Sequence, residues 1–129
     1  MRRTLILSAG LALALSGCSY GADPDRRIDY VLYFHDATTA LDGPAIAIVA
    51  RAAAAARATP TLDVTVAGYA DAPLAPESNQ ILSRLRAQSV ADALVSRGVA
   101  HDRITIVPRR AVGADPGAES GRVEIRVGT

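Results

Sequence analysis

GYADAPLAPESNQILSRLRAQSV, residues 68–90, joins the end of an alternating apolar segment to the start of a long helical pattern. Residues 62–66 alternate between apolar and polar side chains, which predicts a strand with one buried face. After a proline-broken loop, Pro76 can begin a helix that runs to Arg97 and ends at Gly98 as a left-handed cap. The stretch therefore predicts a strand, a loop and a helix in succession.

One face of this predicted helix changes from polar to apolar along its length. At about 100° per residue, five side chains fall within an arc of about 80°, namely Asn79, Ser83, Arg86, Val90 and Leu94. The aliphatic end can pack on a sheet, whereas the polar end lies beside the loop that carries Asp71. Because buried polar groups must find partners or cost stability, these residues line either a buried network or a cleft.

The rest of the chain supplies three more strands and one more helix. Alternation predicts strands near residues 28–34, 103–107 and 122–127, and an alanine-rich helix begins at Asp42-Gly43-Pro44 and ends before Pro60. Two strand–helix units followed by two strands imply an α+β fold. We expect a βαβαββ two-layer sandwich with two helices on one face of a mixed four-stranded sheet, whose other face is polar enough to meet water.

Composition excludes several classes of partner and of chemistry. The 129 residues suit one modest domain plus a targeting segment, and the 14 basic residues, all arginine, nearly balance 13 acidic ones. Because the charges nearly balance, no long-range electrostatic field attracts nucleic acid. The absence of tryptophan argues against a surface on which bases stack or an aromatic surface that binds sugars. His35 and His101 fit no catalytic triad or metal-ligand spacing. We therefore expect no enzyme, cofactor, metal or nucleic-acid partner.

The N-terminus has the features of a lipoprotein signal. Two arginines precede an apolar run that is too short to span a membrane, which needs about 20 residues. The run ends in LSGC, which resembles the bacterial lipobox and implies that Cys18 is acylated, with palmitate among the acyl chains, after cleavage. The alternative is an ordinary signal with one stray thiol. We predict a signal peptide at residues 1–17, a lipidated tether at 18–27 and a domain at 28–129. Ser19, where aspartate would retain the protein at the inner membrane, favours the periplasm-facing leaflet of the outer membrane.

The spacing of the motif residues resembles the OmpA-like C-terminal domain, a peptidoglycan-binding module also found in peptidoglycan-associated lipoproteins. The resemblance covers roughly residues 30–127 and rests on GYAD at 68–71, Asn79, LSxxRAxxV at 82–90, Gly98 and Arg103-Ile104. In that family the aspartate and the arginine clasp the diaminopimelate side chain of the stem peptide. The resemblance therefore implies that Asp71 and Arg86 bind peptidoglycan.

The chemistry of meso-diaminopimelate fits these two residues. Its free end carries an ammonium and a carboxylate on one carbon, so Asp71 can bind the ammonium while Arg86 donates two parallel hydrogen bonds to the carboxylate. Asn79 could orient either group or cap the turn. The alternative is that Asp71 and Arg86 only pair with each other.

Some positions depart from the family pattern. Ala70 and Leu74 stand where the family usually has threonine and glycine, and residues 108–121 replace a longer insertion, so that only Arg122 matches there. Which of Phe34 and His35 faces the ligand stays open. We expect an outer-membrane lipoprotein that ties the membrane to the cell wall non-covalently. The alternative is a degenerate cleft on the same fold, serving as a protein-interaction or envelope-assembly subunit. A hydrolase that uses Asp71 lacks a second carboxylate or nucleophile in the motif.

Overall fold

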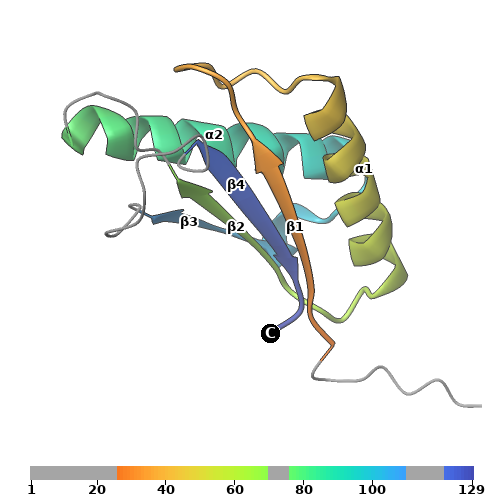
Figure 1. Cartoon of the computed structure of the whole chain (residues 1–129). Helices are drawn as coiled ribbons and strands as arrows, with labels where there is room; N and C mark the ends of the chain where they lie inside the picture. Colours follow the sequence, from red (N-terminus) through yellow and green to blue (C-terminus); the bar gives the residue numbers. More distant parts are fainter. Residues whose placement is uncertain (1–25, 70–75, 110–120) are drawn as a thin grey trace, which may run out of the picture.

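The computed structural model describes residues 26–69, 76–109 and 121–129. In chain order the elements are β1 (Ile28–Tyr33), α1 (Gly43–Ala58), β2 (Val64–Tyr69), α2 (Pro76–Ser96), the short 3-10 helix η1 (His101–Arg103), β3 (Ile104–Arg109) and β4 (Arg122–Val127). Both helices lie on one face of the four-stranded sheet (Figure 1). The predicted α+β fold with βαβαββ order is confirmed.

The strands are arranged in the order β1-β4-β2-β3. β4 runs antiparallel to β1 and to β2, whereas β2 and β3 are parallel and are connected by α2. Tyr33 at the end of β1 pairs with Arg122 at the start of β4, and Gly68 near the end of β2 pairs with Val123. This register brings the end of β1, the start of β4 and the end of β2 to the same end of the sheet.

Helix α1 begins where the sequence places its cap. The Asp42 side chain accepts a hydrogen bond of 2.8 Å from the Ala45 N–H, and Pro44 occupies the first turn, where its missing N–H is not needed. The buried face of α1 consists of small residues, Ala45, Val49, Ala52, Ala53 and Ala56. Small side chains let the helix approach the sheet closely.

Arg103 fastens the far end of α1. Its guanidinium donates hydrogen bonds to the carbonyl oxygens of Ala56, Thr59 and Leu62, at the end of α1 and in the turn that follows it. A helix ends with carbonyls that have no partner within the helix, and a cation there also interacts favourably with the helix dipole. β3 begins at Ile104, one residue later than the sequence predicts, because Arg103 is the last residue of the 3-10 helix η1.

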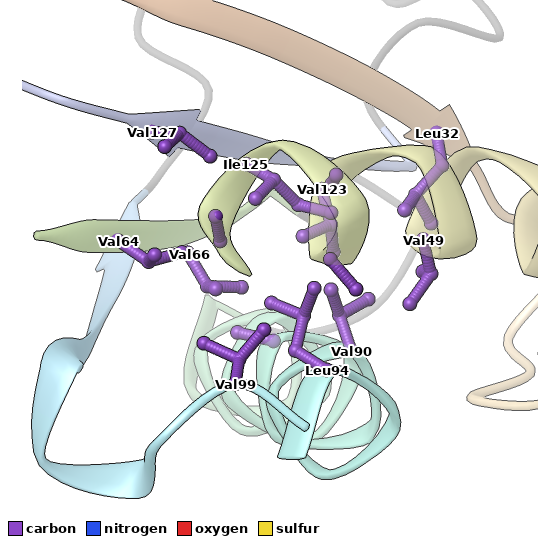
Figure 2. Packing of buried hydrophobic residues seen from close by; sticks show 14 of the residues in the cluster. Leu32, Val49, Val64, Val66, Val90, Leu94, Val99, Val123, Ile125 and Val127 are labelled. Atoms are coloured by element: carbon purple, nitrogen blue, oxygen red, sulfur yellow. The ribbon is translucent and has the colours of Figure 1, made fainter. Parts of the chain in front are cut away.

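The core lies between the helices and the sheet and is built from aliphatic side chains of both layers. Figure 2 shows its centre, where the helix residues meet the strand residues. The fully buried members that it labels are Leu32, Val49, Val64, Val66, Val90, Leu94, Val99, Val123, Ile125 and Val127. Within the described residues, neither helix is long and apolar enough to cross a membrane.

Helix α2 ends close to the predicted position. Its last residue is Ser96, and Gly98 follows with a φ of 91°, the left-handed conformation expected of a glycine cap. The N–H of Val99 donates to the carbonyl of Leu94, which closes the last turn. The predicted helix is thus confirmed to within one residue at its C-terminus.

The open face of the sheet is mixed rather than uniformly polar. Asp29 accepts hydrogen bonds from Arg27 and from Arg126 on the neighbouring strand. Partial burial works against ionisation, but these two bonds and charges outweigh it and hold the pKa of Asp29 below its ordinary value. Val31 and Tyr33 are exposed on the same face of β1.

Candidate functional site

Arg86 lies on the face of α2 that packs toward the sheet. Although its side chain is charged, it is the largest fully buried side chain of the described residues. Only 1% of Arg86 and 2% of Ser83 are exposed, and Asn79 is half-buried one turn earlier. Val90 and Leu94 continue the same face into the core. The predicted change from polar to apolar along one helix face is confirmed.

The Arg86 guanidinium is held by the main chain between β1 and α1. Its Nε donates a hydrogen bond of 3.0 Å to the carbonyl oxygen of Thr38, and its Nη2 donates to the carbonyl oxygen of Asp36. Its Cζ also lies 5.0 Å from the centre of the Phe34 ring, within the range of a cation–π contact. These contacts fix the position of the guanidinium in the interior.

The charge of Arg86 is not neutralised by any carboxylate of the described residues. None of the ion pairs in residues 26–69, 76–109 and 121–129 includes Arg86. Burial lowers its pKa below the ordinary value, but an arginine so shifted is still protonated at neutral pH. Arg86 therefore supplies a buried positive charge that neutral groups, two carbonyls and the Phe34 ring, stabilise in this part of the chain.

The segment between β1 and α1 is shaped to present its carbonyls to Arg86. Asp36 has a φ of 54°, a left-handed conformation that aspartate adopts more readily than most residues. The Thr38 hydroxyl accepts a hydrogen bond from the Ala40 N–H. His35 is exposed, with Nε2 3.8 Å from a carboxylate oxygen of Asp42. Phe34, not His35, therefore faces the arginine.

Gly121, the residue before β4, lies against Arg86 and Phe34. Its carbonyl accepts a hydrogen bond of 2.6 Å from the Phe34 N–H, which extends the pairing of β1 with β4. A Cβ on Gly121 would lie 3.3 Å from Nη1 of Arg86 and 3.0 Å from the Phe34 carbonyl oxygen. No sequence pattern indicates that Gly121 contacts Arg86, because the contact depends on strand register.

Gly68 brings α2 close enough to place these groups. A Cβ on Gly68 would overlap the main-chain carbonyl oxygen of Ser83, so the strand and the helix are in direct backbone contact there. The Ser83 hydroxyl donates to the carbonyl of Gln80 within the helix. Ser83 is thus a small residue that allows close packing rather than a group directed toward a ligand.

Two predicted site residues, Asp71 and Cys18, lie outside the described residues. The predicted signal peptide and most of the predicted tether also lie there. Of the predicted peptidoglycan-binding residues, the structure places Arg86 and Asn79 on one helix face.

Comparison with known proteins gives the family. The sequence model of the OmpA family matches residues 33–122, more than half of the chain and all of the site described above. The chain belongs to the OmpA family. No curated protein sequence matches it.

Solved structures show the same OmpA-like fold. One is the OmpA-like domain of FopA1 from Francisella tularensis subsp. tularensis SCHU S4, at 23% identity and a TM-score of 0.71, over 82% of this chain and 75% of that one. Another is the peptidoglycan-associated lipoprotein from Burkholderia pseudomallei, at 20% identity and a TM-score of 0.64, over 76% and 87%. The periplasmic domain of Helicobacter pylori MotB is similar at 19% identity and a TM-score of 0.65, over 80% and 81%.

A second polar cluster of this OmpA-family domain lies on the open face of the sheet. The Arg122 guanidinium stacks 4.2 Å from the centre of the Tyr69 ring and donates to Glu124, which also accepts from the Tyr69 hydroxyl. Burial works against the Arg122 charge, but Glu124 and nearby tyrosines raise its pKa. These groups satisfy one another, so the cluster cross-links β2 and β4. No group of three metal-ligating side chains occurs among the described residues.

Proposed function

We propose that this OmpA-family domain binds peptidoglycan through the diaminopimelate of its stem peptide. The observation that carries the proposal is the buried charge of Arg86, which has no acidic partner among the described residues. A buried cation of this kind favours an anion, and a guanidinium fits a carboxylate best. The free carboxylate of diaminopimelate supplies that anion.

Asp71 and Asn79 complete the proposed binding site. Asp71 follows the last residue of β2, Tyr69, by two positions in the sequence, and we assign it to the ammonium group of diaminopimelate. Asn79 lies on the same helix face as Arg86, where its amide orients one of the two charged groups. The fold shared with a peptidoglycan-associated lipoprotein supports this proposal.

The direction of the chain supports an anchoring role. β1 enters the sheet at Ile28 and reaches the Arg86 end after Tyr33, so the described N-terminus lies at the opposite end of the sheet (Figure 1). A strand of this length spans about 20 Å. If Cys18 is acylated, as we propose, the chain leads to the membrane from the end of the sheet opposite to Arg86. The domain would then extend from the outer membrane toward the cell wall.

A second candidate function is a protein-interaction or envelope-assembly subunit without peptidoglycan binding. It is favoured by one observation, that Nε and Nη2 of Arg86 already donate to carbonyls of the same chain. An arginine used in this way can be purely structural. Sacculus binding separates the two functions.

The test is sedimentation of the purified full-length protein with isolated sacculi in mild detergent. Arg86→Gln is expected to lose roughly tenfold or more in affinity, because a hydrogen bond to a charged group contributes about 1.5–3 kcal/mol. Arg86→Lys keeps the charge but loses the planar pair of parallel N–H donors, so it is expected to bind sacculi weakly as well.

The matched control is Arg84→Gln, which removes an exposed arginine two residues away on the same helix. Arg84→Gln is expected to bind like the wild type. Cooperative thermal unfolding of each variant above the assay temperature ensures that folded proteins are compared. Equal sedimentation of Arg86→Gln and Arg84→Gln would instead favour the protein-interaction function.

A further inference from the structure

Residues 35–40 form an exposed segment, here called the strap, which is anchored at both ends and contacts Arg86 in its middle. At one end Phe34 is buried, and its N–H donates to the carbonyl of Gly121. At the other end Leu41 packs against the core and Asp42 caps α1. Most strap residues between these anchors are exposed. The ends of the strap are therefore fixed independently of its middle.

Two hydrogen bonds connect the middle of the strap to α2. They are the bonds that Arg86 donates from Nε to the Thr38 carbonyl and from Nη2 to the Asp36 carbonyl. The Ala40 N–H donates to the Thr38 hydroxyl, but this bond lies within the strap. Among the hydrogen bonds of the described residues, those from Arg86 are the ones that join residues 36–38 to α2.

The closed strap also holds a disfavoured backbone conformation. Asp36 has a φ of 54°, in the left-handed region that costs free energy for any residue with a Cβ. Loss of the Arg86 bonds would allow Asp36 to return to an ordinary conformation. The conformation of the strap in this structure, here called closed, thus depends on Arg86.

The same two donors form one of the edges by which a guanidinium binds a carboxylate. Nε–H and Nη2–H point the same way, which allows two parallel hydrogen bonds to one carboxylate. In this structure the Thr38 and Asp36 carbonyls accept from that edge, and only 1% of Arg86 is exposed. A ligand that uses this edge must displace the strap.

We propose that the strap is a carboxylate-selective latch, which a carboxylate opens by replacing the two carbonyls on Arg86. A carboxylate accepts the same two parallel bonds and also carries the charge opposite to that of the guanidinium, which a neutral carbonyl does not, so a carboxylate outcompetes the strap. A neutral amide oxygen offers Arg86 no more than the strap carbonyls do, and it leaves the latch closed. The inference rests on the proposed function, since it takes Arg86 as the carboxylate site.

The latch is tested by nuclear magnetic resonance relaxation on the full-length protein in detergent micelles. Order parameters of the amides at residues 36–38 are measured with meso-diaminopimelate, with sodium acetate and with acetamide, each at matched ionic strength. Both carboxylates are expected to lower these order parameters from about 0.85 to below about 0.6, and acetamide is expected to leave them unchanged. Loosening on ligand binding would not arise from a merely structural loop.

Two substitutions at Asp36 supply matched variants, because both remove its charge and its side chain is exposed. Asp36→Val disfavours a positive φ, whereas Asp36→Asn tolerates it. Asp36→Val is expected to have a loosened strap without ligand and to bind acetate about threefold to tenfold more tightly, because less free energy is needed for opening. Asp36→Asn is expected to behave like the wild type.

The outcomes separate the latch from the proposed function. If acetate loosens the strap but meso-diaminopimelate does not bind, the latch stands and the proposed ligand is wrong. If meso-diaminopimelate binds while residues 36–38 stay ordered, the latch is overturned and the proposed function stands. Unchanged order with both carboxylates, or no gain in acetate affinity in Asp36→Val, also overturns the latch.

Discussion

A single buried guanidinium organises the end of the sheet where the candidate site lies. Arg86 links α2 to the segment after β1 through two carbonyls and lies against the Phe34 ring. Its position depends in turn on Gly68, whose missing side chain lets β2 and α2 touch through their backbones. One residue without a side chain thus determines where a long charged side chain can reach.

Gly68→Ala is expected to destabilise the protein by about 3 kcal/mol or more, toward or beyond the upper end of overpacking costs, because its Cβ would overlap a main-chain oxygen. The matched control is Gly43→Ala, at the start of α1, where the added Cβ has no described atom within 4 Å apart from its own residue, the adjacent residues and the nearby helix backbone. Urea unfolding of both variants gives the comparison. A loss no larger in Gly68→Ala than in Gly43→Ala would show that β2 and α2 can separate without cost.

Among the elements, α1 depends on a side chain from a distant part of the chain. Its N-terminus is capped locally by Asp42, whereas its C-terminus is held by Arg103, which lies just before β3. Arg103 also bonds the carbonyls of the turn into β2. Helix α1, the turn and β3 are therefore expected to unfold together.

Arg103→Gln is expected to lower the free energy of unfolding by about 3 kcal/mol, because it leaves several part-buried carbonyls without a charged donor. Arg51→Gln, which removes an exposed arginine in the middle of α1, is the control and is expected to change stability by less than about 0.5 kcal/mol. Chemical denaturation followed by circular dichroism measures both. Similar values for the two variants would mean that water replaces Arg103 at the helix end.

At the scale of the whole molecule, the N-terminal end of the described residues and the Arg86 site lie at opposite ends of the sheet. The described N-terminus leads into the start of β1, and the Arg86 site lies beyond the end of that strand (Figure 1). Both helices cover one face, and Val31 and Tyr33 are exposed on the other. The two proposed roles of the protein, anchoring and binding, are therefore separable by mutation.

Cys18→Ala is expected to release the protein from the membrane fraction while it still binds sacculi, because the proposed acyl chains and Arg86 belong to different ends of the molecule. Cell fractionation and sacculus sedimentation measure the two properties separately. Retention of Cys18→Ala in the membrane would argue against acylation. Loss of sacculus binding in the soluble variant would show that the proposed anchor takes part in recognition.

The sequence by itself determined the elements and the face on which the site lies. Helix starts and ends depend on neighbouring residues, so Asp42, Pro44 and Gly98 could be interpreted without the fold. The stripe from Asn79 to Leu94 follows from helix geometry alone, which made Arg86 a candidate before any contact was known.

Only the tertiary structure decided what surrounds Arg86. Its partners, the carbonyls of Asp36 and Thr38, lie 50 and 48 residues away in the chain, and every residue has such a carbonyl, so no sequence pattern distinguishes these two. Phe34 and Gly121 reach the site through the register of β1 with β4. Long-range strand pairing and main-chain hydrogen bonds have no local signature, which is the physical reason that the sequence indicated the arginine but not its environment.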